Sequence, residues 1–324
     1  MIQPRRAASV DIGSTSVHLL VAELTQDGLE PLLDLSELLG LGGRIEGSGL
    51  LGGAVRAELA GILAAYVGEA RRLGSEAIVL AGTDPLRHAA DAAPACREIE
   101  LASGVPVHVL DQAEEGALTL LGVADGAAHD DLAVIDIGGG STEIVLAGRD
   151  GIKAIIGLSL GASRLAASVG LDDPPTEAQM AALRQEANRV VATAPDLELG
   201  DVVAVGGTAY GVARVATGPG YGERLVDARG IALALSIAGR ERSAQVAELF
   251  GLNPRRARIL PAGAVIVAAL AERYGIERIR ASELGIREGL IRAVLDDPIA
   301  WRDRLGRPSR PAVRTGEATA AASA

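Results

Sequence analysis

One short pattern occurs twice in this chain, and it limits the folds that the chain can adopt. In each copy an apolar run reaches Asp-Ile-Gly, passes through a turn of small residues and continues as a second apolar run, which reads VDIGSTSVHLLVA at 10–22 and IDIGGGSTEIVLA at 135–147. This order is typical of a β-hairpin. Because the repeated unit is a whole strand–turn–strand, the pattern predicts two duplicated domains.

Length and composition agree with two domains. A chain of 324 residues exceeds one compact core, and its 48 % hydrophobic residues exclude a disordered chain. Aromatic residues make up only 2 %, so the cores must consist of Ala, Leu, Val and Ile. The polar break at 124–131 predicts domains at 1–126 and 127–298. The Arg-, Pro- and Ala-rich segment 299–324 lacks periodicity and is expected to be a disordered tail.

Strand and helix patterns alternate along the chain. Apolar residues at helical spacing predict helices over 54–72, 112–123, 176–194 and 285–295. Short apolar runs predict strands over 77–80, 105–110, 152–156, 202–205 and 276–280, and the Gly-rich stretch 39–43 is expected to be a loop. Asp111 followed by Glu114 resembles the capping box that starts a helix. The alternation predicts an α/β fold.

Charge and apolar patterning exclude several classes of protein. The formal net charge is −11, which disfavours binding to duplex nucleic acid. No apolar run approaches the roughly 18 residues of a membrane span, the start does not resemble a signal peptide, and one cysteine excludes a disulfide framework; a cytoplasmic protein is expected. Residues 255–324 nevertheless carry 13 Arg against 8 Asp and Glu. This excess is either an approach path for an anionic substrate or a codon bias.

The repeated turns are suited to binding phosphate. Small residues let backbone N–H groups approach phosphoryl oxygens, and Ser and Thr hydroxyls add further donors. A carboxylate ends each preceding strand, where it can hold Mg²⁺ or its waters. The predicted phosphate-binding residues are Gly13, Ser14, Thr15, Gly138, Gly139, Gly140, Ser141 and Thr142, together with Gly207 and Thr208 at a strand-to-helix turn. A single turn of this kind is more simply explained as an ordinary hairpin turn. Two aligned copies favour the interpretation that the turns bind phosphate.

The repeated hairpins resemble the phosphate motifs of the actin-like ATPase superfamily. In detail the chain resembles the exopolyphosphatase / guanosine pentaphosphate phosphohydrolase (Ppx/GppA) family, and the matching blocks are spread in the family's order over residues 7–295. They are VDIGSTSVHLLVA (10–22), GTDPLRHAAD (82–91), VLDQAEEGALTLLGV (109–123), VIDIGGGSTEIVL (134–146), SLGASRL (159–165), AVGGTA (204–209), RILPAGA (258–264) and LGIREGLI (284–291).

The resemblance implies a fold and an activity. It implies two ribonuclease-H-like domains with mixed sheets flanked by helices and an active-site cleft between them. The implied reaction releases terminal orthophosphate from inorganic polyphosphate, with short chains expected, or from guanosine pentaphosphate. Mg²⁺ is the implied cofactor. The expected partners are polyphosphate or guanosine penta- and tetraphosphate as ligands and a second copy in a homodimer, with no nucleic acid and no membrane.

The resemblance also implies roles for individual residues. Glu115 matches the family's general base, which would take a proton from water aligned with the leaving oxygen. Arg87 in TDPLR would stabilise charge on the transferred phosphoryl group. Asp136 and Glu143 match carboxylates associated with metal and phosphate, and Asp11 is their counterpart in the first domain. Without the resemblance, Glu115 would be an ordinary first-turn Glu and Arg87 a salt-bridged surface residue.

Departures from the family pattern keep two other functions open. Thr15 stands where the family usually has Asn, Ala117 where it has Arg, and Ser159 where it has Pro. Loss of an Arg near the phosphate path weakens the case for polyanion hydrolysis, which leaves a non-catalytic sensor of alarmone or polyphosphate as one alternative. A small-molecule kinase of the same superfamily is the other. The histidines His18, His88, His108 and His129 and Cys96 show no ligand spacing and are predicted to be non-catalytic.

Overall fold

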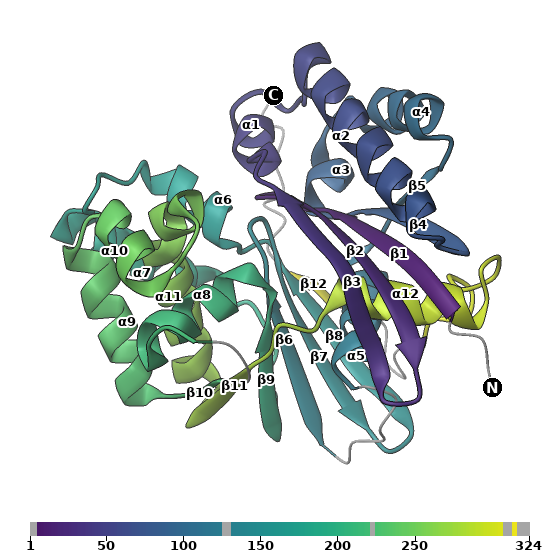
Figure 1. Ribbon diagram of the computed structural model, residues 1–324. Helices are drawn as coiled ribbons and strands as arrows, with labels where there is room; N and C mark the ends of the chain where they lie inside the picture. Colours follow the sequence, from purple (N-terminus) through teal and green to yellow (C-terminus); the bar gives the residue numbers. More distant parts are fainter. Residues whose placement is uncertain (1–4, 125–130, 221–223, 307–312, 316–324) are drawn as a thin grey trace, which may run out of the picture.

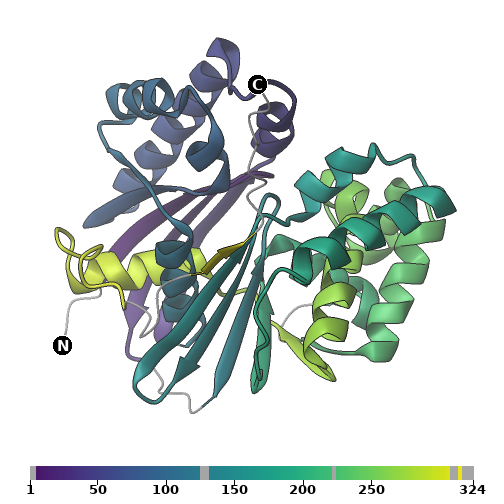
Figure 2. The same ribbon diagram turned by 180° about the vertical axis from the view of Figure 1, so that it is seen from behind.

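Two β-sheets form the centres of two lobes in the computed structural model, which describes residues 5–124, 131–220, 224–306 and 313–315. Lobe I is built on a five-stranded sheet of order β3-β2-β1-β4-β5, and lobe II on a seven-stranded sheet of order β10-β11-β9-β6-β7-β8-β12. Figure 1 shows lobe I in purple and blue and lobe II in teal and green, and Figure 2 shows the same arrangement from behind.

The elements have the following bounds. Lobe I contains β1 (Arg5–Ile12), β2 (Val17–Thr25), β3 (Gly28–Glu37), α1 (Leu41–Ser48), α2 (Gly53–Arg72), β4 (Ala77–Gly82), α3 (Asp84–His88), α4 (Ala92–Ser103) and β5 (Val107–Val109). Then follow α5 (Gln112–Val123), β6 (Leu132–Ile137), β7 (Thr142–Gly148), β8 (Gly151–Leu158), α6 (Ala162–Val169), α7 (Glu177–Val191), β9 (Asp201–Val205) and α8 (Gly206–Thr217). The chain continues with β10 (Arg224–Asp227), α9 (Ala228–Arg240), α10 (Ser243–Phe250), α11 (Pro254–Tyr274), β11 (Arg278–Ala281), α12 (Ile286–Asp296) and β12 (Val313–Thr315).

The sheet topology confirms the duplication predicted from the repeated pattern. In lobe I, β1 pairs antiparallel with β2 and parallel with β4. In lobe II, β6 pairs antiparallel with β7 and parallel with β9. Strands β3-β2-β1-β4-β5 thus correspond in order to β8-β7-β6-β9-β11. The two copies of Asp-Ile-Gly end the equivalent central strands β1 and β6.

Strand alternation gives each sheet a core on both faces. In β1, Ala8, Val10 and Ile12 pack toward α2 and α4, whereas Ala7 packs toward α12. In β6, Ile135 packs with α7 to α11 and Val134 packs with α5. Helices α5 and α12 therefore fill the space between the lobes.

Two glycines let α5 and α12 cross with their backbones in contact. A Cβ at Gly122 would collide with the Gly285 carbonyl, and a Cβ at Gly289 would collide with the Leu118 carbonyl. Helix α12, which follows lobe II in the sequence, packs against β1 and β4 of lobe I, while α5 packs against β6, β7 and β8 of lobe II. Each lobe is thus completed by a helix from the other side of the chain.

Several local predictions differ from the structure. The expected loop at 39–43 contains the start of α1, and β3 and β10 have no counterpart among the predicted strands. The expectation of a disordered tail over 299–324 is wrong in part, because residues 299–306 fold back on the molecule, with Trp301 only 4 % exposed, and β12 pairs with β8. Segments 307–312 and 316–324 and the predicted boundary at 126/127 lie outside the described residues. In the part of the chain that the structure describes, no helix is long and apolar enough to cross a membrane.

The crossing of α5 and α12 gives a prediction about stability. Gly289→Ala should lower the free energy of unfolding by about 1–3 kcal/mol or more, because the new methyl group must push two helix backbones apart. Gly47→Ala in α1 is the matched control, since a Cβ there meets nothing within 4 Å. Denaturant titration of both variants checks this, and equal stabilities would contradict it.

Candidate active site

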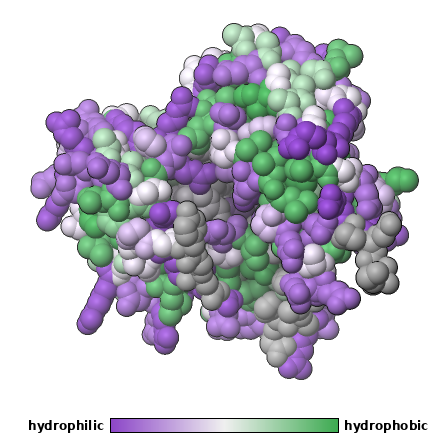
Figure 3. Space-filling model, viewed as in Figure 1, coloured by the Kyte–Doolittle hydropathy of each residue, from purple (hydrophilic) through white to green (hydrophobic). Residues whose placement is uncertain are grey.

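A cavity of about 410 Å³ lies between the lobes, and both repeated turns line it. Figure 3 shows the surface hollowed between the lobes, with hydrophilic residues in the hollow. Of the residues predicted from sequence, Asp11, Gly13, Ser14, Thr15, Glu115, Asp136, Gly138, Gly139, Gly140, Ser141, Gly207 and Thr208 line it. His18, Tyr210, Arg256, Ile286 and Arg287 are further lining residues. The cavity therefore gathers most of the predicted site.

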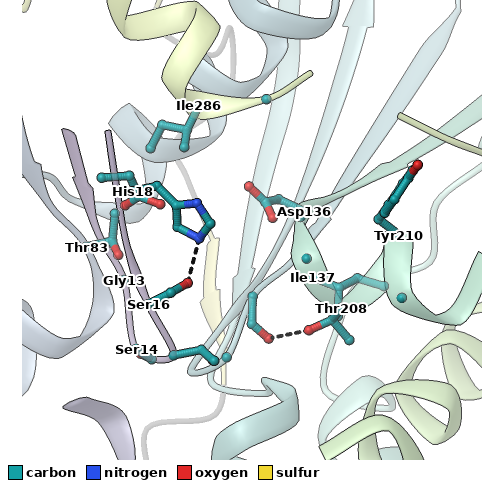
Figure 4. Close-up of a pocket in the computed structure, with 18 of the residues that line it drawn as sticks. Gly13, Ser14, Ser16, His18, Thr83, Asp136, Ile137, Thr208, Tyr210 and Ile286 are labelled. Atoms are coloured by element: carbon teal, nitrogen blue, oxygen red, sulfur yellow. Dashed lines mark hydrogen bonds between the residues drawn. The ribbon is translucent and has the colours of Figure 1, made fainter. Parts of the chain in front are cut away.

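Strand register explains why the two aspartates face the same cavity. Asp11 in β1 lies opposite His18 in β2, and Asp136 in β6 lies opposite Glu143 in β7. Directly opposite residues of an antiparallel pair point to the same face of a sheet. The duplication thus places His18 where its copy carries Glu143. In Figure 4, His18 and Ser16 face Asp136, Thr208 and Tyr210 across the cavity.

Four carboxylates lie close together, Glu115 and Glu143 buried and Asp11 and Asp136 half-buried, and their partial removal from water shifts their pKa values upward. Burial together with the charges of Glu115 and Asp136 raises the pKa of Asp11 to about 7. Burial and Glu115 raise the pKa of Asp136 to about 7, although Thr119 Oγ1 donates to its Oδ2 at 3.2 Å. The pKa values of Glu115 and Glu143 are also raised, chiefly by burial. Asp11 and Asp136 are therefore partly protonated near neutral pH.

Arg87 is the cation in direct contact with this cluster. Its Nη1 donates to Glu115 Oε2 at 2.5 Å and to the Leu110 carbonyl at 2.9 Å. Among the described residues, its buried Nη2 and the Oδ1 of Asp11 have no hydrogen-bond partner. Unpartnered buried polar atoms are costly in free energy, and of these two residues Asp11 lines the cavity, where its Oδ1 can contact a group that enters.

The two phosphate turns touch at one end of the cleft. Thr15 Oγ1 lies 2.8 Å from Ser163 Oγ of lobe II. Ser14 Oγ donates to Asp84 Oδ2 at 2.9 Å. Arg164 Nη2 donates to both Asp84 carboxylate oxygens at 3.2 Å, and Arg164 also pairs with Glu46 of α1. These bonds join the lobes and close this end of the cleft.

Two half-buried arginines, Arg256 and Arg287, also line the cavity. Arg256 lies against the Gly206–Gly207 turn at the start of α8, so closely that a Cβ at Gly207 would collide with its guanidinium. Arg256 Nη2 donates to His18 Nε2 at 3.0 Å. Burial, with Arg287 and Arg256 nearby, lowers the pKa of His18 to about 3, so this imidazole is neutral. Arg287 pairs with Asp34 at 2.8 Å. Anions entering here meet positive charge.

Three predicted site residues do not line the cavity. Thr142 is fully buried and its hydroxyl donates to the Leu160 carbonyl at 2.6 Å, so the prediction that it binds phosphate is wrong for its side chain. Glu143 is 1 % exposed and accepts from Gln112 Nε2 at 3.2 Å behind the turn. Arg87 lies beneath the cavity floor through its contact with Glu115. Glu143 and Arg87 therefore contact residues near the cavity without lining it themselves.

Sequence reasoning missed His18 and Arg256. His18 had a signal, because the alignment of the two hairpins sets it on Glu143. For Arg256 the signal in the sequence was weaker: it is one of the 13 Arg of residues 255–324, and of these Arg256 and Arg287 line the cavity. His88 does not line the cavity but contacts the lining residue Asp84, and His108 packs on Trp301. His129 lies outside the described residues.

The ion pair between Asp84 and Arg164 predicts a pH dependence of stability. Burial acts to raise the pKa of Asp84, but hydrogen bonds and charges from His88, Arg164 and Ser14 outweigh it and lower that pKa to about 2. A lowered native pKa adds stability above the unfolded value, which is lost as the pH falls through the native one. Asp84→Asn should cost about 2 kcal/mol at pH 7 and less near pH 2.5. Glu46→Gln, on the exposed side of Arg164, should cost less than about 1 kcal/mol. Denaturant titrations at both pH values check this, and a pH-independent cost would contradict it.

Comparisons with known proteins agree with this geometry. The model of the Ppx/GppA phosphatase family matches residues 20–297. Exopolyphosphatase 1 of Mycobacterium leprae is 28 % identical over 305 residues, covering 90 % of each chain. The guanosine-5'-triphosphate,3'-diphosphate pyrophosphatase of Vibrio atlanticus is 25 % identical over 302 residues, covering 91 % of this chain and 60 % of that protein.

Solved structures show the same fold. The Aquifex aeolicus member of the Ppx/GppA family is 25 % identical, with a TM-score of 0.75 over 91 % of this chain and 99 % of that one. An exopolyphosphatase from Cytophaga hutchinsonii is 18 % identical, with a TM-score of 0.81 over 90 % and 98 % of the two chains. The predicted fold class of two mixed-sheet domains flanked by helices is confirmed. With the family model matching most of its length, the chain belongs to the Ppx/GppA phosphatase family.

Proposed function

We propose that this protein hydrolyses the terminal phosphoanhydride bond of inorganic polyphosphate, with short chains preferred, or of guanosine pentaphosphate. The relatives named above, an exopolyphosphatase and a guanosine pentaphosphate pyrophosphatase, support this substrate class. Arg256 and Arg287 line the cavity together with both turns. Their positive charge would attract a chain of phosphates, whose terminal group would lie at the turns.

The pair of Glu115 and Arg87 supports hydrolysis most strongly. Glu115 is 8 % exposed and lines the cavity at the start of α5. Its raised pKa, caused by burial, makes it a stronger base than an exposed glutamate once it is ionised. Arg87 lies behind Glu115, and its Nη1 keeps the Glu115 carboxylate oriented. From there its positive charge would stabilise charge on the transferred phosphoryl group. Glu115 would then take the proton from the attacking water.

Mg²⁺ fits this site as a partly protein-bound ion. Among the described residues no group of three Asp, Glu, His or Cys side chains could hold a metal ion. However, Mg²⁺ commonly uses one or two carboxylates and completes its shell with substrate phosphates and waters. Asp11, with its unpartnered Oδ1, and Asp136 are the carboxylates that would hold it. When bound, the ion would neutralise phosphate charge. Glu143 is engaged by Gln112 and is not proposed as a ligand.

Glu115→Gln tests the proposed base. The change should lower kcat for phosphate release by a factor of about 10²–10⁴, because the amide keeps the shape of the side chain but cannot accept the proton. Substrate affinity should stay within a few-fold, since the phosphate turns are untouched. Steady-state phosphate release and calorimetric binding measure the two effects.

The matched control for that test is Glu177→Gln. Glu177 also occupies the first turn of a helix, α7, but it is exposed and lies outside the cavity. If Glu115 were only an ordinary first-turn glutamate, both variants would keep wild-type turnover. Such a result would remove Glu115 from the mechanism.

Substrate and metal dependence are tested together. Phosphate release should require Mg²⁺ and disappear with a chelator when short polyphosphate, long polyphosphate and guanosine pentaphosphate are compared. Asp11→Asn should raise the Mg²⁺ concentration for half-maximal rate by about 10-fold, whereas Glu143→Gln should leave that concentration unchanged. Tight guanosine tetraphosphate binding without any phosphate release would indicate a sensor, and sugar-stimulated ATP consumption would indicate a kinase.

A further inference from the structure

The junction between β5 and α5 is held by two arginines from opposite sides. On the cleft side, Arg87 Nη1 bridges the Leu110 carbonyl and Glu115, as described above. On the outer side, Arg302 Nη2 bridges the Val109 carbonyl at 2.8 Å and Glu114 Oε2 at 2.6 Å. The two arginines thus grip consecutive carbonyls and consecutive glutamates of the same short segment.

The outer arginine belongs to a docked segment that follows α12. Trp301 beside it is 4 % exposed and packs edge-on against His108 of β5, with ring centroids 5.3 Å apart. Arg302 Nε also donates to Glu114 Oε1, so the guanidinium makes a two-pronged contact with the carboxylate. Although burial of Glu114 acts in the opposite direction, Arg302 and the Asp111 N–H hold the pKa of Glu114 below its usual range. This ion pair is therefore present at neutral pH.

Glu114 connects Arg302 to the first turn of α5. Its Oε2 accepts the Asp111 N–H at 2.9 Å, and its own N–H donates to Asp111 Oδ1 at 2.8 Å, which completes the capping box. The same turn carries Gln112, which donates to Glu143, and Glu115. Contacts that hold Glu114 in place therefore also fix the direction in which the Glu115 side chain projects from the helix.

We propose that Arg302 is a positioning residue for Glu115, acting from outside the cleft through Glu114 and the Val109 carbonyl. This rests on the proposed function, in which Glu115 is the base. Proton transfer requires the carboxylate within hydrogen-bond reach of the attacking water, and small misplacements of such groups are costly in rate. The Glu115 side chain extends from the first turn of α5, so the orientation of that turn sets the position of its carboxylate.

Arg302→Gln is the test, with three readouts. We expect kcat to fall about 10-fold while KM stays within twofold, because the turn loosens but the phosphate turns are unchanged. Amide hydrogen exchange in residues 107–118 should become faster. The chain has one Trp, so an unchanged emission maximum of Trp301 shows that the segment remains docked.

Matched variants separate positioning from general stability. Arg304→Gln removes a neighbouring arginine that pairs with Asp296 and Asp297 of its own segment, and it should change none of the readouts. Arg302→Lys keeps the charge without the two-pronged geometry and should give an intermediate kcat. Glu114→Gln removes the partner from the other side and should reproduce the loss in kcat. The double variant Arg302→Gln/Glu114→Gln should be no slower than either single variant.

Each outcome bears on the proposal. A wild-type kcat in Arg302→Gln, exchange rates that do not change, or additive losses in the double variant would overturn it. An equal loss in Arg304→Gln would overturn it in favour of a stability effect. If the wild-type protein releases no phosphate from any of the three substrates, the proposed function fails separately. In that case, unchanged amide exchange in Arg302→Gln would also refute the stabilisation of α5 by Arg302. Faster exchange would establish that Arg302 stabilises α5 but would exclude a role for Arg302 in catalysis.

Discussion

The enclosure of several carboxylates around one guanidinium governs the chemistry of this cleft. Burial is the main cause that raises the pKa values of Asp11, Asp136, Glu115 and Glu143, and the charge of Glu115 raises those of the other three further. Of these four carboxylates, Arg87 donates to Glu115 alone. Such an arrangement is unstable when every acid is ionised. It becomes favourable when protons or a cation compensate the charge, which is the electrostatic basis of the proposed Mg²⁺ and phosphate binding.

Much of the fold follows from the repeated Asp-Ile-Gly pattern. The pattern predicts two hairpins, and the matching strand orders of the two sheets confirm that they belong to equivalent domains. The turns were also predictable as cavity lining, because small residues between two strands must form a tight turn wherever they occur. Alignment of the hairpins places His18 on Glu143, so the chemical asymmetry between the halves can already be read from the sequence.

Other features depend on contacts that sequence spacing does not encode. Thr142 belongs to the same motif as Ser141, yet strand alternation turns its hydroxyl toward the Leu160 carbonyl. Strands β3 and β10 are half exposed and lack a continuous apolar run, which is why periodicity missed them. Residues 299–306 dock through the buried ring of Trp301, the packing of Leu305 and ion pairs of Arg302 and Arg304. The composition of a segment does not show whether its few apolar and charged side chains find such partners.

The exchange of α5 and α12 between the lobes has a consequence for how the molecule holds together. The underside of the lobe I sheet is covered by α12, and the facing side of the lobe II sheet is covered by α5. Separating the halves at the sequence boundary would leave each sheet with an uncovered apolar face. The duplicated domains are therefore no longer autonomous: they form one cooperative folding unit, in which loss of either half removes part of the core of the other.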